Sequence, residues 1–185
     1  MLPLSRPVAY STTTITELMI PSYANFGGKI HGGLILSLMD KVAYACAAKH
    51  AGGYCVTVSM NAVDFLAPVE VGELVSLTAS VNYVGTSSMV LGVKVISEDV
   101  TTGVKRHTNS SYLTMVAKDE LGKPRKVPEL ELNKPCEVRR YLDAIKRREF
   151  IKGYKHEVEV NKMNDAQAMG RVNELSKERC VLNVC

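Results

Sequence analysis

The longest apolar run of the chain begins at Gly32 and ends near Lys49. It is apolar on nearly every side, which is typical of a helix in the core of a protein. The glycine pair Gly52 and Gly53 follows and predicts the end of the helix near His50. The apolar positions are Leu34, Ile35, Leu36, Leu38, Met39, Val42, Ala43, Cys46 and Ala47.

Segments rich in β-branched residues, with alternating apolar and polar positions, predict five strands around this helix. One precedes the helix and four follow it, separated by short turns that favour antiparallel neighbours. The expected fold class is therefore α+β, with one antiparallel sheet wrapped around one helix. The predicted strands are Val8 to Met19, Tyr54 to Phe65, Glu73 to Val84, Ser88 to Glu98 and Lys105 to Ala117.

The pattern changes after Pro128, where a charged linker leads to a predicted helix from Pro135 to about Lys152. Its apolar stripe consists of Val138, Tyr141, Leu142 and Ile145. We expect this stripe to pack on the body of the protein or on a neighbouring subunit. A weaker signal predicts another helix from Asp165 to Arg179. We therefore expect one domain over 1–128 and a linker with a helical extension over 129–185. The segment beyond about Lys134 is expected to be dispensable for chemistry.

Composition narrows the choice of function. The 185 residues carry a net charge of +4, with no Trp and no dense basic stripe, which argues against a nucleic-acid partner. The apolar run contains Asp40 and Lys41 and is too short to span a membrane comfortably, and no secretory signal is visible. The five cysteines form no CxxC pair or metal-ligand spacing, and we expect no metal site and a cytoplasmic protein.

The entry of the apolar helix carries the candidate chemistry, in the pattern N-x6-GG-x6-D formed by Asn25, Gly32, Gly33 and Asp40. A carboxylate within an apolar helix is costly unless it is paired, hydrogen-bonded or used. Free N–H groups point out of a helix start, where the dipole favours negative charge. Together these groups are able to hold a developing oxyanion and to attack or hydrate the carbon that carries it.

Each of these residues also has a purely structural interpretation. Asp40 pairs in that case with Lys41 or with a neighbouring subunit, and Asn25 belongs to an ordinary turn. The glycines then only permit a tight entry into the helix. His31 either orients the loop or contacts substrate, because a His–Asp dyad needs a proximity that the spacing does not guarantee.

Several segments, in this order, resemble the hotdog-fold acyl-CoA thioesterases, and in particular the branch called acyl-CoA hydrolases. They are NFGGKIHGG, LSLMD, VTVSMNAVDFLAPVEVGE, VGTSSM and DELGKPRKVP, and the resemblance covers roughly Tyr10 to Pro128. It implies hydrolysis of acyl-CoA to a carboxylic acid and CoA. It also implies no cofactor beyond the CoA of the substrate, and a homo-oligomer built of dimers, with a hexamer expected.

The resemblance also implies roles for individual residues. Asp40 is the nucleophile or the general base, Asn25 acts with the aspartate of a neighbouring subunit, and the N–H groups of Gly32 and Gly33 polarise the thioester carbonyl. His31 is a candidate substrate contact. The candidate contacts of the CoA nucleotide are Gly85, Thr86, Ser87, Ser88, Lys123, Arg125 and Lys126.

The alternatives remain open at this point. The turn from Gly85 to Ser88 is a hairpin whether or not CoA binds, and the basic run that follows Gly122 is equally typical of a solvated loop. A regulatory module that binds acyl-CoA without turnover needs the same pocket but not Asp40. A hotdog dehydratase ranks lower, because His31 precedes the helix.

Overall fold

A computed structural model describes residues 3–177 and 179–180 and divides the chain into two compact units, Met1–Ile145 and Lys146–Cys185. The first unit extends beyond the predicted boundary at Pro128. The reason is local pairing: strand β8, Glu129–Glu131, pairs in parallel with β1, Ser5–Pro7. Ala144, on the helix that follows, is fully buried.

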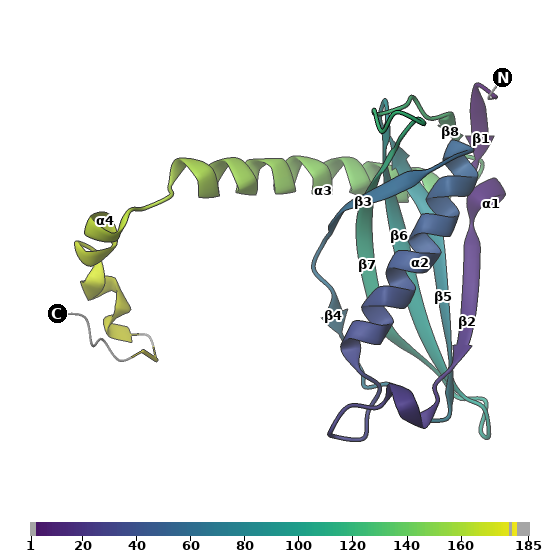
Figure 1. Ribbon diagram of the computed structural model, residues 1–185, viewed down its shortest axis with the longest axis horizontal. Helices are drawn as coiled ribbons and strands as arrows, with labels where there is room; N and C mark the ends of the chain where they lie inside the picture. Colours follow the sequence, from purple (N-terminus) through teal and green to yellow (C-terminus); the bar gives the residue numbers. More distant parts are fainter. Residues whose placement is uncertain (1–2, 178, 181–185) are drawn as a thin grey trace. The chain divides into compact units, whose positions relative to one another are not determined.

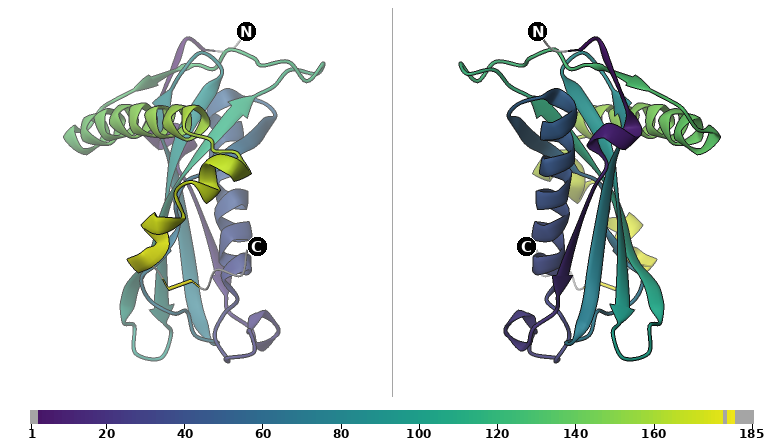
Figure 2. Two further views of the ribbon diagram at one scale, coloured as in Figure 1. Left: turned by 90° about the vertical axis from the view of Figure 1, so that its left-hand side faces the viewer. Right: turned by 90° about the vertical axis from the view of Figure 1, so that its right-hand side faces the viewer.

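The predicted apolar helix is α2, Gly32–Ala51, and it lies lengthwise against the main sheet (Figure 1). His31 is its N-cap, and Gly52 ends it in the left-handed conformation with φ of 67°. Ile35, Met39 and Val42 on α2 are 1% exposed or less and form the core with the sheet. The side views show α2 running along one face of the twisted strands (Figure 2).

The main sheet has the order β2-β5-β6-β7-β3, and every neighbouring pair is antiparallel. The predicted α+β class, with one antiparallel sheet around a central helix, is confirmed. Strand β4, Asp64–Phe65, also pairs with β7. The other bounds are β2 Thr13–Leu18, β3 Cys55–Met60, β5 Glu73–Val84, β6 Ser88–Asp99 and β7 Lys105–Ala117.

The two faces of this sheet differ in chemistry. Leu77 and Ala79 on β5 are fully buried against α2. Because side chains alternate along a strand, Thr78 between them lies on the opposite face, which we call the outer face. In the strand register Thr78 is paired with Lys94, and Lys94 with Ser110, so a polar row crosses the outer face.

Two predicted strands are interrupted. The segment predicted as a strand from Val8 begins instead as a short helix, α1, Val8–Ser11. Both the amide and the hydroxyl of Thr12 donate to the carbonyl of Val8, a local bond that competes with strand pairing. The segment Tyr54 to Phe65 divides into β3 and β4, with a register shift between Thr57 and Ser59.

The C-terminal helices are longer or shorter than predicted. Helix α3 is Pro135–Val160 and extends beyond the predicted end at Lys152. In the first unit its Tyr141 ring lies 5.0 Å from the ring of Tyr83, whereas Val138 and Leu142 of the predicted stripe are 43% and 53% exposed. In the second unit the predicted final helix is the short α4, Asp165–Met169, followed by a 3-10 helix, Val172–Lys177.

Candidate active site

Asp40 lies in the middle of α2, half-buried, at the side of the helix that faces β3. The hydroxyl of Thr57, on β3, donates to Oδ1 of Asp40 at 2.6 Å. This bond fixes the carboxylate, and no hydrogen bond from the residues that the structure describes reaches its second oxygen. Asp40 therefore has a hydroxyl partner and does not rely on Lys41.

Thr57 is a candidate site residue that no sequence pattern indicated. It lies in an ordinary strand pattern, and no local spacing relates it to Asp40, which is 17 residues away. Only the placement of β3 beside α2 brings the two together (Figure 1). Thr57 is exposed, because β3 is an edge strand of the main sheet.

Asn25 lies in the exposed loop that precedes α2. Its Oδ1 accepts hydrogen bonds from the backbone N–H groups of Gly27 at 2.9 Å and Lys29 at 3.2 Å. The oxygen of the amide is thus used inside the loop, and its NH₂ group is left as a donor. A cavity of about 420 Å³ begins here and is lined by Asn25, Gly32 and the Phe65 ring, among others.

The backbone N–H groups of the two glycines at the start of α2 differ in their hydrogen bonds. The N–H of Gly33 donates to Nδ1 of His31 at 2.9 Å, so His31 caps the helix. The Gly33 N–H is therefore occupied, and Gly32 retains the N–H that is open to a ligand. A Cβ on Gly32 would lie 3.1 Å from the ring of Phe65, so glycine permits that ring to approach the helix start.

The opposite end of α2 is held by two arginines. Arg125 donates to the carbonyl of Ala51 at 2.8 Å, and Arg6 donates to the carbonyl of His50 at 2.9 Å. Cations are favourable at a helix C-terminus, where carbonyl groups lack partners. The structure thus gives Arg125, predicted as a contact of the CoA nucleotide, a position in which it caps α2.

Three other predicted nucleotide contacts lie together. Gly85, Thr86 and Lys126 line a cavity of about 560 Å³, which Tyr141 from α3 also lines. The N–H of Gly85 donates to the carbonyl of Ser88 at 2.7 Å and closes the predicted hairpin turn. Ser87 accepts a backbone bond from Ala117, and Lys123 lies exposed on the following loop.

The predicted site residues therefore form separate groups within one chain. Asn25, His31, Gly32 and Gly33 lie at the entry of α2, and Asp40 lies about 12 Å further along the helix axis, at 1.5 Å per residue. The turn and basic loop lie beyond the other end of α2, where Arg125 contacts Ala51. One protomer does not place Asn25 next to its own Asp40.

Exposed apolar side chains gather along the edge that carries Thr57. Among them, Val58 on β3 is 60% exposed and Phe65 on β4 is 53% exposed. The rings of Tyr44 and Tyr54, 41% and 59% exposed, lie 6.4 Å apart between α2 and the start of β3. An apolar patch on an edge strand is typical of a surface that another chain covers.

Two thiols lie on the elements that carry the candidate site, Cys46 on α2 and Cys55 on β3, but both are unsuited to nucleophilic attack. Cys46 and Cys55 are buried and free, as predicted. Burial raises the pKa of each thiol to about 11, so the thiolate that reacts is scarce at neutral pH. Within the described ranges, no three His, Cys, Asp or Glu side chains gather as metal ligands. No described helix is both long and apolar enough to cross a membrane.

Solved structures similar to this one are thioesterases. A hexameric acyl-CoA thioesterase, in its apo form, has a TM-score of 0.80 and 40% identity, with 82% of this chain and 97% of that chain covered. An acyl-CoA hydrolase from Staphylococcus aureus, in complex with butyryl-CoA, CoA and CoA disulfide, has a TM-score of 0.77 and 31% identity, with 91% and 99% covered. Further structures of that hydrolase carry alanine in place of an aspartate, a threonine or an asparagine.

The sequence comparisons agree. Protein VdlD from Helicobacter pylori is 45% identical over 148 residues, which cover 77% of this chain and 84% of VdlD. The family model of the thioesterase superfamily matches residues 27–104, which contain Gly32, Asp40 and Thr57. The family match, the identity to relatives over most of their length and the similar solved structures agree with the architecture described above. The chain therefore belongs to the thioesterase superfamily and has its hotdog fold.

Proposed function

We propose that this protein is an acyl-CoA thioesterase, which hydrolyses acyl-CoA to a carboxylic acid and CoA, with Asp40 as the residue that acts on the thioester. The observation that carries the assignment is the carboxylate of Asp40, held by Thr57 at 2.6 Å beside an open sheet edge. The three positions replaced by alanine in the Staphylococcus aureus hydrolase have the same separations along the chain as Asn25, Asp40 and Thr57.

The chemistry assigns a part to each group. Attack on a thioester places negative charge on the carbonyl oxygen, which preorganised N–H donors stabilise. The Gly32 N–H and the Asn25 NH₂ group are the donors that the fold leaves open. Asp40 acts either as nucleophile, forming an acyl anhydride that water then hydrolyses, or as general base, taking a proton from the attacking water. In both routes the CoA sulfur leaves as the thiol once protonated.

The site is shared between two protomers in this proposal. Asp40 and Thr57 come from one chain and Asn25 from the other, because a single chain holds them apart along α2. The apolar edge that includes Val58 and Phe65 is the surface on which the second chain packs. The protein is a homo-oligomer, and we infer dimers assembled into a hexamer, the state of the similar apo thioesterase.

The nucleotide end of CoA fits the cavity lined by Thr86 and Lys126, where an exposed ammonium group is available to phosphates. No cofactor besides the CoA of the substrate enters this mechanism. A cytoplasmic location is part of the proposal and is supported by the free buried thiols of Cys46 and Cys55, which suit a reducing compartment.

The decisive experiment measures release of CoA thiol from a panel of acyl-CoA substrates by wild-type protein and by Asp40→Asn. We expect the variant to keep its fold and oligomeric state and to lose most of its kcat. A folded variant with near-wild-type kcat refutes the role of Asp40. If the wild type binds acyl-CoA in calorimetry but releases no thiol from any substrate, the protein is instead a regulatory acyl-CoA-binding module.

Mixing two inactive variants tests the shared site. Asn25→Ala and Asp40→Ala protomers, once exchanged at equal amounts, form mixed dimers in which one of the two sites is intact. Random pairing restores about a quarter of the wild-type activity. Exchange is verified by native mass spectrometry with one variant labelled with nitrogen-15, since the unlabelled variants have nearly the same mass. Mixed dimers without activity show that each site is built from one chain.

A further inference from the structure

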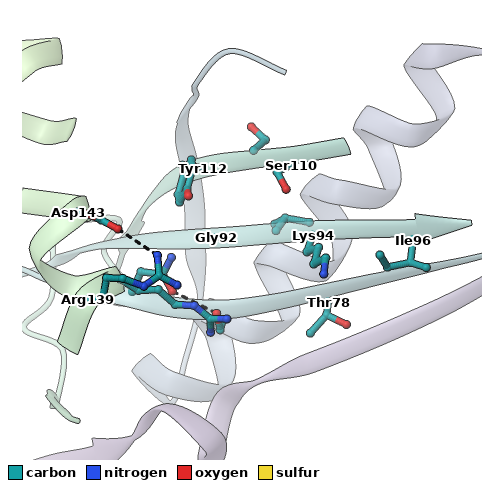
Figure 3. A pocket seen from close by; sticks show the side chains of 13 residues that line it. Thr78, Gly92, Lys94, Ile96, Ser110, Tyr112, Arg139 and Asp143 are labelled. Carbon is teal, nitrogen blue, oxygen red and sulfur yellow. Dashed lines mark hydrogen bonds and ion pairs between the residues drawn. The ribbon is translucent and has the colours of Figure 1, made fainter. Parts of the chain in front are cut away.

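A third cavity lies on the outer face of the sheet, away from Asp40. It has a volume of about 460 Å³ and lies between strands β5, β6 and β7 and the first turns of α3 (Figure 3). Val93 and Val95 on β6 are buried in the core with α2, so Lys94 between them points to the opposite face. Neither the family assignment nor the proposed mechanism uses this cavity.

The cavity is basic. Lys94 on β6 and Arg139 and Arg140 on α3 line it, against one carboxylate, Asp143. Arg139 contacts Asp143 at 3.5 Å, as the dashed line in Figure 3 shows. Within the part of the chain that the structure describes, neither Lys94 nor Arg140 forms an ion pair. Three cations and one carboxylate leave two positive charges on the walls.

The floor of the cavity adds a buried donor. Asn82 on β5 is 6% exposed, and its Oδ1 accepts from the hydroxyl of Ser80 at 3.1 Å. Its NH₂ group is therefore the free end of the amide, and it lies over Gly92, where a Cβ would approach the nitrogen to 2.5 Å. The ring of Tyr112 stands beside Gly92 and forms an aromatic wall (Figure 3).

We propose that this cavity binds the phosphate group of a small molecule, at a site separate from the one that contains Asp40. A phosphate monoester carries a charge of about −1.5 to −2, which matches the two positive charges of the walls better than a single carboxylate does. Guanidinium groups and an amide NH₂ are donors suited to phosphate oxygens. The bound phosphate links Lys94 on the sheet to Arg140 on α3.

Calorimetry with three probes tests the chemistry of the ligand. Adenosine 5′-monophosphate and inorganic pyrophosphate are expected to bind to the intact oligomer, more weakly at higher salt, whereas adenosine is not. Tighter binding of the nucleotide than of pyrophosphate identifies a base stacked on Tyr112. Comparable binding identifies the phosphate alone as the ligand. Binding of adenosine as tight as that of the nucleotide, or no binding of either phosphate probe, overturns the proposal.

Matched variants locate the site. Lys94→Met and Arg140→Gln should each weaken phosphate binding about tenfold, the low end for a hydrogen bond to a charged group. Both should leave hydrolysis of acyl-CoA unchanged in the absence of the probe. Lys152→Met removes a cation from the same helix outside the cavity and should have no effect.

Two outcomes count against this location. Equal weakening by Lys152→Met would mean that the probes respond only to the general charge of the protein. Loss of binding in Lys126→Met, with Lys94→Met unaffected, would place the phosphate in the substrate cavity near Thr86 instead. Thermal denaturation of each variant excludes unfolding as the cause of lost binding.

Discussion

Replacing Thr57 by valine tests the contact on which the active site depends. Valine keeps the β-branched shape that suits strand β3 and removes only the hydroxyl that donates to Asp40 at 2.6 Å. Because the side chain of Thr57 is exposed in the protomer and is not part of its core, we expect the variant to fold as the wild type does, and native mass spectrometry checks its assembly.

The magnitude follows from the type of bond. A hydrogen bond to a charged group contributes about 1.5–3 kcal/mol, so we expect its loss to cost at least the lower value. About 1.5 kcal/mol corresponds to a roughly tenfold fall in kcat/KM. The loss should appear mainly in kcat, because Thr57 positions the group that reacts and does not bind the rest of the substrate.

The assay is release of CoA thiol, with Thr57→Ser as the matched control. Serine keeps the donor and should remain within about threefold of the wild type, since only a methyl group is lost. In an Asp40→Asn background, Thr57→Val should change the residual rate little, because residues that act together are not additive. A folded Thr57→Val variant with wild-type kcat/KM refutes the reasoning, as does a Thr57→Ser variant that is equally impaired.

Three further predictions concern the C-terminal end of α2 and the basic loop beside it. Lys126→Ala should raise KM for acyl-CoA but not for an acyl-pantetheine that lacks the nucleotide, whereas Arg125→Ala should mainly lower Tm, because it removes the donor to Ala51. Burial lowers the pKa of His50 below its usual 6.5, so the native state favours neutral His50. Stability is therefore full above pH 6.5 and falls as the pH drops below it, and in His50→Gln the loss of Tm between pH 7 and 5 should shrink.

Long, regular elements could be predicted from the sequence. The bounds of β5 and β7 agree with the prediction, and α2 ends within about two residues of it, because long alternation and an apolar run followed by glycine are strong local signals. The parallel pair of β1 and β8 was not predicted. Each strand has three residues, too few for periodicity to appear.

The candidate site was predicted only in part, because a sequence shows local patterns but not contacts between distant segments. Asn25, Gly32 and Asp40 lie in one stretch of chain and show a pattern, whereas Thr57 joins them through tertiary placement. Arg125 illustrates the opposite case. Its basic run suggests phosphate binding, but the fold directs its guanidinium to the last turn of α2. Charge alone does not tell whether an arginine faces a ligand or a helix end.

The way α2 is fixed explains why Asp40 can work beside an exposed edge. The cap at His31, the arginines at the carbonyl end and a face of fully buried side chains hold the helix rigidly. Asp40 is therefore positioned before substrate arrives, as electrostatic catalysis requires. Asn25, by contrast, lies on an exposed loop, and its Oδ1 bonds give that loop its own shape. A protomer thus offers a rigid carboxylate to one site and a preformed donor to another. In the proposed shared site, this division makes assembly of the oligomer a condition for catalysis.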